Sequence, residues 1–438
     1  MKIRMIAFGA AIASACFAQP TLAQQNARTT YRQTGYNISH YDDVAVSPSD
    51  AKPPSSGCSC SQPDGSISCD LSGCDSSGCD GLGCSNEPWK LFSGKNCMGL
   101  NIAGWSQVGY HTSRNAGGGL LTGTPAPANF NTYDRVQLQQ QWIYAEKIAD
   151  GSNGVGFGGR IDYLYGTDAP DTQAFGINSP GHWDNSWDNG GQYGHAMPQL
   201  YGEVAYGATS VKVGHFFTII GQEVVQATGN FFYSRQFTFY NAEPFTHTGA
   251  LATTVVDDKT TVWSGYVTGW DSGFRDNGDA YIGGFKQQIN DCTSVIYTSA
   301  LGRFGEVERE RGQIHSLILT SNLSDKLTYI GQTDYLFTND EADVGIRNTF
   351  GFINYLIYKL NDKWSVGSRT EWFNYSTEKY GIVNDDLYNQ TIGLNYKPIP
   401  NLTFRPEYRH VWDKGAHGVN ENGGSSQGTF GTDMIFTF

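Results

Sequence analysis

Cysteine is the residue type in this chain whose spacing most directly suggests chemistry. Cys69, Cys74, Cys79 and Cys84 recur every five residues, mostly within Gly-Cys-Asp units. Closely spaced thiolates can bind zinc or copper(I), but zinc sites typically use a Cys-x-x-Cys clamp, and no histidine lies inside this repeat. Disulfides are therefore the better interpretation, and the sequence predicts neither a metal site nor a cofactor.

The amino-terminal residues indicate export to an oxidising compartment. A basic start is followed by an apolar run to Ala18 and a small-residue exit ending at Ala23, which predicts a signal peptide over residues 1–23. A lipidated cysteine at Cys16 is the competing interpretation, although Ala stands where such sites usually have Leu. Without the signal peptide the cysteine count is even, as expected of a disulfide framework. The candidates are Cys58, Cys60, Cys69, Cys74, Cys79, Cys84, Cys97 and Cys292.

Serine and histidine are the residue types that could form a nucleophile and base pair. The candidate bases are His215, His247 and His315, and the candidate nucleophiles are Ser234 and Ser316. Local packing or hydrogen bonding explains each histidine more simply. We therefore expect that the protein is not an enzyme.

The elements that must position these residues are short alternating segments. From Gly99 to Phe438 the chain contains roughly sixteen segments of about ten residues, the length with which strands of a transmembrane β-barrel cross a bilayer. Aromatic residues make up 13% of the chain and charged residues only 16%, which suits a barrel with aromatic girdles better than a soluble surface. The predicted fold is an all-β antiparallel barrel with strands over residues 99–110, 134–147, 154–166, 198–207, 210–219, 246–255, 259–270, 278–289, 292–302, 311–322, 326–337, 347–360, 363–375, 388–398, 401–413 and 427–438.

The connections between these segments alternate between short and long. The short ones are turns such as Ala208–Thr209, Asn290–Asp291 and Asn361–Asp362, whereas the first three long ones have about 23, 31 and 26 residues. Short turns are typical of the periplasmic end of outer-membrane barrels, and long loops of the extracellular end. An even number of strands places both termini in the periplasm. Cys292 lies beside a turn at that end, so we expect it to pair with one of the seven cysteines from Cys58 to Cys97.

Period-two alternation separates a lipid face from a lumenal face in the predicted strands. In the last strand Phe430, Met434, Phe436 and Phe438 share one face, and the terminal aromatic residue resembles the signal that barrel-insertion machinery recognises. Pro406 removes one ladder donor, so we expect a bulge there. The charged residues predicted to face the lumen are Arg160, Asp162, Glu203, Lys212, Lys286, Asp334, Arg369, Glu371, Arg405, Glu407 and Arg409.

Several stretches of the chain resemble a known family. They are EPWKLF at 87–92, the pair Gly104–Trp105, GGRIDYLYGTDA at 158–169, KVGHFFTIIGQE at 212–223 and NFFYSRQFTFYNAEPFTHTGA at 230–250. Together they resemble the OmpL-like putative β-barrel porin family of Gram-negative-type outer membranes, over roughly residues 87–438. The resemblance implies a water-filled pore through which small hydrophilic solutes or ions diffuse passively.

The same resemblance suggests a role for the third long connection, at about residues 220–245. In general porins the third loop folds into the barrel and narrows it. The resemblance therefore implies that Glu223, Tyr233, Arg235 and Glu243 are candidates for the pore constriction. The alternative is a loop packed on the rim, with its charges paired to each other.

These observations divide the chain into a signal peptide at 1–23, a flexible linker at 24–57, a Cys-rich periplasmic segment at 58–98 and a transmembrane barrel at 99–438. Removing Lys2 and Arg4 from the 29 basic residues leaves 27 against 42 acidic ones, which disfavours nucleic acid as a partner. The expected location is the outer membrane, with lipids and lipopolysaccharide as neighbours. The sequence leaves the oligomeric state undecided, with a homotrimer as one possibility. Two other functions compete: a structural or adhesive barrel with an occluded lumen, working through its extracellular loops, and a soluble secreted β-protein that binds carbohydrate.

Overall fold

The structure, a computed structural model, describes residues 89–91, 99–112, 134–174, 193–274, 278–305, 309–379, 383–414 and 424–438. The predicted signal peptide, the linker and seven of the eight disulfide candidates lie outside these ranges. The strands are β1 (Asn101–His111), β2 (Gln137–Lys147), β3 (Val155–Gly166), β4 (Gly194–Ala196), β5 (Leu200–Tyr206), β6 (Thr209–Phe217), β7 (Thr246–Val255), β8 (Thr260–Val267), β9 (Asp279–Asn290), β10 (Thr293–Arg303), β11 (Arg311–Asn322), β12 (Leu327–Asn339), β13 (Gly345–Lys359), β14 (Trp364–Thr377), β15 (Val383–Ile399), β16 (Leu402–Asp413) and β17 (Ser426–Thr437). The described helices are α1 (Ala169–Thr172), η2 (Ala227–Gly229) and α2 (Phe237–Ala242).

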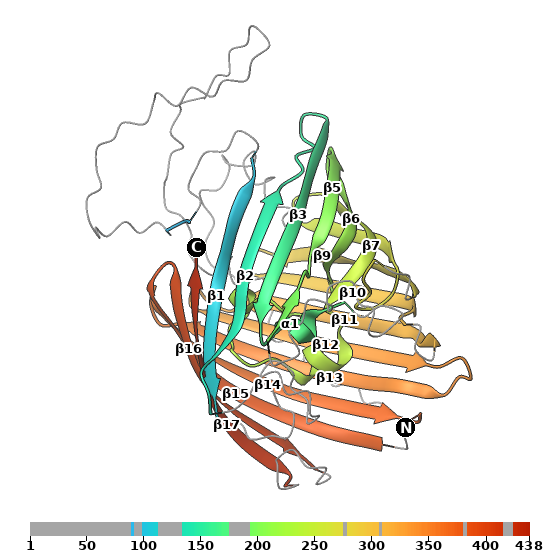
Figure 1. Cartoon of the computed structure of the whole chain (residues 1–438). Helices are drawn as coiled ribbons and strands as arrows, with labels where there is room; N and C mark the ends of the chain where they lie inside the picture. Colours follow the sequence, from blue (N-terminus) through green and yellow to red (C-terminus); the bar gives the residue numbers. More distant parts are fainter. Residues whose placement is uncertain are drawn as a thin grey trace, which may run out of the picture.

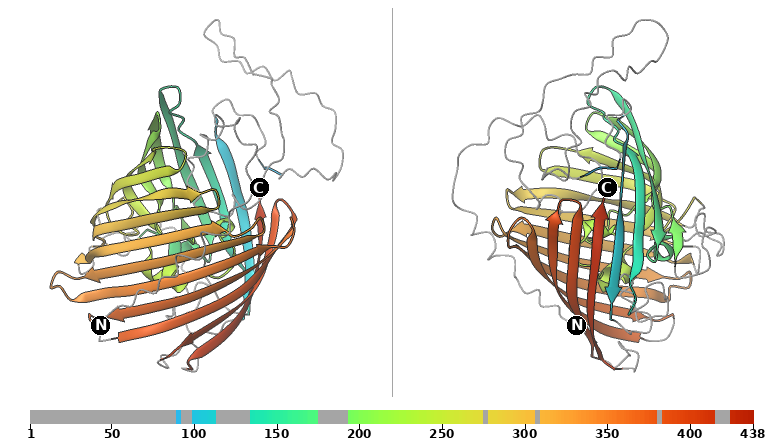
Figure 2. Two further views of the ribbon diagram at one scale, coloured as in Figure 1. Left: turned by 180° about the vertical axis from the view of Figure 1, so that it is seen from behind. Right: turned by 60° about the vertical axis from the view of Figure 1, so that its left-hand side comes forward.

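The strands form one antiparallel sheet that closes on itself (Figure 1). Since β4 and β5 both pair with β3, they share one position, and the closed barrel has sixteen strand positions. The closing pair is β1 with β17, which run side by side in Figure 2. There Gly104 and Phe438 exchange two backbone hydrogen bonds of 3.0 and 2.9 Å. Closure pairs the first strand with the last and so removes the two free edges of an open sheet, as a membrane-spanning sheet requires.

Side chains alternate between the outside and the inside of the barrel along each strand. Leu317 and Phe352 are exposed on the outer face, whereas their neighbours Ile318 and Ile353 are buried on the inner face. The period of two follows from strand geometry. Among the residues that the structure describes, no helix is long and apolar enough to span a membrane.

All sixteen predicted strands are confirmed, most of them within two residues at each end. The largest difference is β15, which begins at Val383, five residues before the expected start. The bulge expected at Pro406 is wrong, because β16 pairs with β17 in unbroken register through Pro406 and Thr432. The irregularity in the β15–β16 pairing falls between Tyr396 and Ile399, close to the turn.

The two ends of the barrel differ in their connections. At one end tight turns join successive strands, such as β5 to β6 and β9 to β10. Trp89 attaches to this end: its N–H donates to Asn401 Oδ1 at 2.7 Å, and Asn401 Nδ2 donates to the Trp89 carbonyl at 2.8 Å. The Trp89 ring also stacks on Phe436, with 6.1 Å between centroids. Trp89, which precedes β1 in the chain, is therefore held at the short-turn end.

Residues 218–245, which connect β6 to β7 and contain η2 and α2, are called the inserted segment below. Most of its residues are buried. Its hydrogen bonds reach inner-face side chains on β2, β12, β13, β14 and β16. The segment therefore lies inside the barrel rather than on its rim.

Candidate functional site

Two carboxylates of the barrel wall bind the backbone of the inserted segment. Glu407 on β16 accepts hydrogen bonds from the N–H groups of Tyr233 and Ser234, at 2.8 and 3.2 Å. Glu371 on β14 accepts from the N–H groups of residues 237–238, at 2.9 and 2.8 Å. The latter two groups open α2 and have no acceptor within the helix, so a carboxylate suits them in both charge and geometry.

A buried ion pair fixes the middle of the inserted segment. Arg369 on β14 lies 2.5 Å from Glu223 and also donates to the carbonyl and hydroxyl of Ser234, at 2.8 and 2.9 Å. Glu223 accepts further hydrogen bonds from the Tyr355 hydroxyl at 2.8 Å and the Gln236 N–H at 2.7 Å. Removing one partner of such a pair would leave a buried charge uncompensated, which typically costs about 3–5 kcal/mol.

The other two polar residues in the middle of the segment bond mainly to nearby groups. Arg235, only 1% exposed, donates to the carbonyls of Val224, Val225 and Tyr233 at 3.0 to 3.1 Å. The Tyr233 hydroxyl accepts from Gln139 on β2 at 2.8 Å. Burial lowers the pKa of Arg235 and raises the pKa of Tyr233 well above its usual range.

The end of the inserted segment presents a carboxyl group to a second carboxyl group on the wall. Gln332 Nε2 donates to Glu243 Oε1 at 2.7 Å and to Asp334 Oδ1 at 3.0 Å, and Ser316 donates to Asp334 at 2.7 Å. Burial, followed by the negative charge of Asp334, raises the pKa of Glu243 well above its usual range. Gly221 has φ +90°, and a Cβ there would overlap the Glu243 carboxylate, so a glycine is required.

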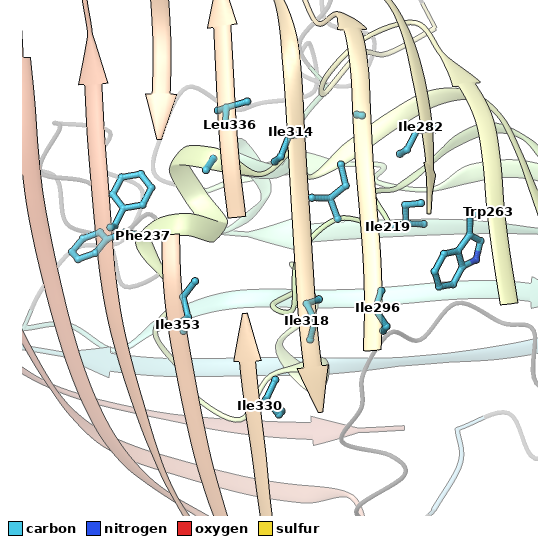
Figure 3. Close-up of a cluster of buried hydrophobic side chains, with 14 of the residues drawn as sticks. Ile219, Phe237, Trp263, Ile282, Ile296, Ile314, Ile318, Ile330, Leu336 and Ile353 are labelled. Atoms are coloured by element: carbon cyan, nitrogen blue, oxygen red, sulfur yellow. The ribbon is translucent and has the colours of Figure 1, made fainter. Parts of the chain in front are cut away.

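The opposite side of the inserted segment packs on an apolar wall. Figure 3 shows Ile219 and Phe237 of the segment among isoleucines that project inward from neighbouring strands. Strand β13 is apolar on both faces because its inner residues Ile353, Tyr355 and Ile357 belong to this cluster. The inward wall residues of the cluster include Leu251, Trp263, Val267, Ala280, Ile282, Ile296, Ala300, Ile314, Ile318, Ile330, Leu336 and Phe373.

Glycines on the wall make room for the side chains of the segment. A Cβ added at any of the four glycines named below would come within about 3.0 Å of a side chain of the segment, which is closer than nearly all Cβ contacts in proteins. The pairs are Gly109 with Tyr233, Gly351 with Thr238, Gly367 with Phe231 and Gly393 with Phe232. The wall and the segment are thus complementary in shape as well as in charge.

Two more of the predicted lumenal charges, Arg160 and Arg405, form ion pairs on the barrel wall. Arg160 on β3 pairs with Asp162 on the same strand at 2.6 Å and with Glu146 on β2 at 3.4 Å. Arg405 pairs with Asp433 at 2.5 Å and donates to two carbonyls of the segment. Asp433 was not among the predicted lumenal charges, although its alternation with Met434 along β17 places it on the inner face.

Three further predicted lumenal charges lie on the strands β5, β6 and β9. Glu203 and Lys212 are register partners on β5 and β6. Lys212 lies 5.2 Å from the ring centroid of Tyr201 and 5.1 Å from that of Phe216. Lys286 is on β9, next to the outward and exposed Phe285.

The candidate catalytic residues have local partners. His215, His247 and His315 bond to Thr248 at 2.8 Å, to the Gly269 carbonyl at 3.0 Å and to the Tyr297 hydroxyl at 2.7 Å. Ser234 accepts from Arg369, and Ser316 donates to Asp334. A Gly-x-Ser-x-Gly match at 424–428 leads into strand β17 rather than from a strand into a helix, so it is not a nucleophile elbow.

A closed barrel of sixteen strands, with apolar side chains outside and a loop folded into its interior, defines the class of outer-membrane porins. Residues 99–438 match the model of the family described as putative β-barrel porin-2, OmpL-like, and the chain belongs to this family. The protein is accordingly an outer-membrane channel for passive diffusion. A comparison with curated proteins found no match.

Solved structures with a similar fold are outer-membrane proteins. The trimer form of OmpT from Vibrio cholerae, folded in vitro, has a TM-score of 0.52 and 10% identity, covering 77% of this chain and 99% of OmpT. The outer-membrane-expressed form of OmpT has a TM-score of 0.50 and 10% identity, covering 77% of this chain and 97% of OmpT. At this identity the likeness supports the fold alone.

Proposed function

We propose that small hydrophilic solutes and ions cross the barrel and that the inserted segment narrows their path. The observation that carries the proposal is the double attachment of the segment, to charged side chains on β14 and β16 and to the apolar cluster on β7 to β14. A segment held on two sides reduces the free cross-section, and fixed charges beside it sort solutes by size and sign.

In this proposal the four constriction candidates set the width of the pore indirectly, by holding the inserted segment in place. Glu223 and Glu243 hold the segment to β14 and β12, and Tyr233 holds it to β2. Arg235 holds the fold of the segment itself. Each is at most 5% exposed, so their substitution is expected to change conductance by moving the segment.

The surroundings of the barrel are part of the same proposal. We infer that the short-turn end and both termini face the periplasm, that Phe438 is read by the insertion machinery, and that lipids and lipopolysaccharide surround the outer face. Short turns at the end that carries Trp89 and Phe438 support the orientation. A homotrimer is supported by the trimer form of OmpT, and the channel family supports a protein that is not an enzyme.

Single-channel recording tests the proposed function. The mature chain, inserted into a planar bilayer in potassium chloride, is expected to give stable conductance steps. A variant without residues 24–86 serves as the comparison, because it removes the amino-terminal region while keeping Trp89 and the barrel. If neither protein gives open channels, the proposal of an open porin fails.

The burial of the inserted segment also supports a second function. Segment residues such as Phe232, Arg235 and Gln236 are at most 1% exposed, which fits an occluded lumen and a barrel that works through its extracellular loops. The same recording separates the two functions, since an occluded barrel conducts only after the segment is displaced.

A further inference from the structure

A row of four polar side chains crosses the outer face of the neighbouring strands β13 to β16. Thr370 on β14 is the register partner of Asn354 on β13 and of Gln390 on β15. Gln390 is in turn the register partner of His410 on β16. With about 4.8 Å between strands, these four positions span roughly 14 Å. The four residues are called the polar row below.

Alternation places the polar row on the side of the barrel that faces the membrane. On β13, Asn354 lies two residues after Phe352, which is 45% exposed. On β15, Gln390 lies two residues before Ile392, which is 55% exposed. The polar row therefore points away from the lumen and from the inserted segment.

Rows of aromatic side chains on the same face indicate the depth of the polar row in the membrane, because such residues mark the two interfaces with water. The adjacent row on the outer face, towards the looped end, consists of Phe352, Trp372, Tyr388 and Trp412. A second aromatic row, near the short turns, consists of Trp364, Tyr396 and Phe404. Positions 388 and 396 of β15 are about 26 Å apart along the strand and about 20 Å apart across a membrane at a tilt of about 40°, close to the apolar band of such barrels. Position 390 lies between them, so the polar row is inside the apolar band.

Hydrogen bonds within the chain satisfy the polar row only in part. Asn354 Oδ1 accepts from the Tyr329 hydroxyl at 2.7 Å, and Gln390 Nε2 donates to Ser368 Oγ at 2.9 Å. Among the residues that the structure describes, Asn354 Nδ2, the Thr370 hydroxyl and Gln390 Oε1 have no hydrogen-bond partner. Lipid chains have neither donors nor acceptors, so these groups are costly to leave facing hydrocarbon.

The free groups of the polar row are complementary to the same groups of a second copy. Asn354 Nδ2 and the Thr370 hydroxyl can donate, and Gln390 Oε1 can accept. A second copy carries this row at the same depth in the same membrane, and around a symmetry axis normal to the membrane the same surface of each copy meets. Hydrogen bonds between polar side chains also join helices within membranes.

Large side chains on both sides of the polar row supply area for packing. The aromatic row of Phe352, Trp372, Tyr388 and Trp412 lies on its looped side. The exposed side chains of Leu356, Ile392 and Tyr408 lie on its other side. A second copy would thus cover aromatic and aliphatic surface around a hydrogen-bonded centre.

We propose that the outer face of β13 to β16 is the surface through which copies of this protein contact each other in the membrane, with the polar row at its centre. The homotrimer considered above has no assigned contact surface, and this proposal gives it one. The inference concerns assembly and does not depend on an open lumen.

Photo-crosslinking in intact outer membranes tests what covers this surface. Benzoylphenylalanine in place of Ile392, next to the polar row, is expected to give a covalent product that contains two copies of the chain. Benzoylphenylalanine in place of Leu317 is the control, because Leu317 is 43% exposed on the outer face of β11, away from the row, and is expected to give lipid adducts. Mass spectrometry identifies the products, and a product at position 392 that contains only lipopolysaccharide or a different protein would contradict the proposal.

Substitutions in the polar row test its part in assembly. The double variant Thr370→Leu, Gln390→Leu is expected to be monomeric in detergent by light scattering, at a concentration at which the wild type is oligomeric, because leucine removes the free polar groups and suits lipid. The double variant Thr370→Ser, Gln390→Asn keeps these groups and should stay oligomeric. Gln141→Leu is the matched control, since Gln141 is a polar residue on the outer face of β2, bonded to Ser106 at 2.6 Å, and should also stay oligomeric.

A monomeric wild type would overturn the inference, as would a folded leucine double variant that remains oligomeric. If the leucine double variant does not fold, the crosslinked product at position 392 decides. A monomeric protein that conducts leaves the porin function standing and removes the interface. An oligomer joined at this face that never conducts has the opposite meaning.

Discussion

Glu243 and Asp334 are two buried carboxyl groups that share one amide donor, Gln332. Since that nitrogen is 2.7 Å from one carboxylate oxygen and 3.0 Å from the other, the two oxygens are at most 5.7 Å apart. Two such groups cannot both carry a charge at low cost in a buried setting. A proton between them stabilises the docked inserted segment.

This pair predicts a pH-dependent stability. Docking raises the pKa of Glu243 above its ordinary value of 4.5, so the docked segment binds a proton more tightly than the released one. The stabilisation is complete below about pH 4.5 and is lost as the pH rises through the raised pKa. Thermal unfolding in detergent should therefore give a lower Tm at pH 8 than at pH 5, and Glu243→Gln should remove most of this difference. Glu310→Gln, which alters an acid paired with Arg347 at the looped end, should keep the difference.

At the scale of elements, the inserted segment depends on the surfaces of β14 and β15. Phe231 and Phe232 sit against Gly367 and Gly393: a Cβ at Gly367 would overlap the Phe231 ring, and a Cβ at Gly393 would press on the Phe232 ring at 3.0 Å. Most of the energy of such a contact comes from close packing, which an added methyl group already disturbs.

Filling these positions is expected to displace the segment. Gly367→Val and Gly393→Val should each weaken docking by about 1–3 kcal/mol, the usual cost of overpacking, and the double variant should increase single-channel conductance. Gly202→Val is the control, because Gly202 on β5 has open space where the new side chain would lie. Unchanged conductance in a correctly folded double variant would show that the segment does not limit the pore.

At the scale of the whole molecule, Trp89 and Cys292 lie at the same end of the barrel. Trp89 bonds to the β15–β16 turn, and Cys292 lies between β9 and β10, six strand positions along the sheet. With about 4.8 Å between strands, the two turns of a closed sixteen-stranded barrel are roughly 25 Å apart. Cys84 is five residues before Trp89; an extended chain of that length spans about 17 Å at most, and a disulfide adds about 6 Å between Cα atoms, so Cys84 could reach Cys292 only at full extension.

The predicted disulfide partner of Cys292 is therefore narrowed to the cysteines that precede Trp89 in the chain. Peptide mapping without reduction should find Cys292 joined to one of the cysteines from Cys58 to Cys84, and not to Cys97. Cys97 is excluded because it is only four residues before β1, which lies on the far side of the barrel from Cys292. A Cys292 that alkylates fully in the unreduced protein would contradict the prediction.

The sequence alone determined the strands, their closure into a barrel and the contrast between its two ends. Each of these depends on local information: alternation with a period of two, turn residues at fixed positions and the lengths of connections. The inward direction of Arg369, Glu371, Arg405, Glu407 and Arg409 could be predicted for the same reason, because a strand fixes the face of each residue.

Only the tertiary structure decided what these inward side chains touch. Arg369 pairs with Glu223, which is 146 positions away in the chain, and Glu371 binds the start of α2 rather than a neighbouring strand. The inserted segment likewise explains why the inner face of β13 is apolar and why glycine stands at positions 367 and 393, since the segment packs against all of them. Contacts across the interior of a barrel join residues that share no local pattern, so alternation gives the direction of a side chain but not its partner.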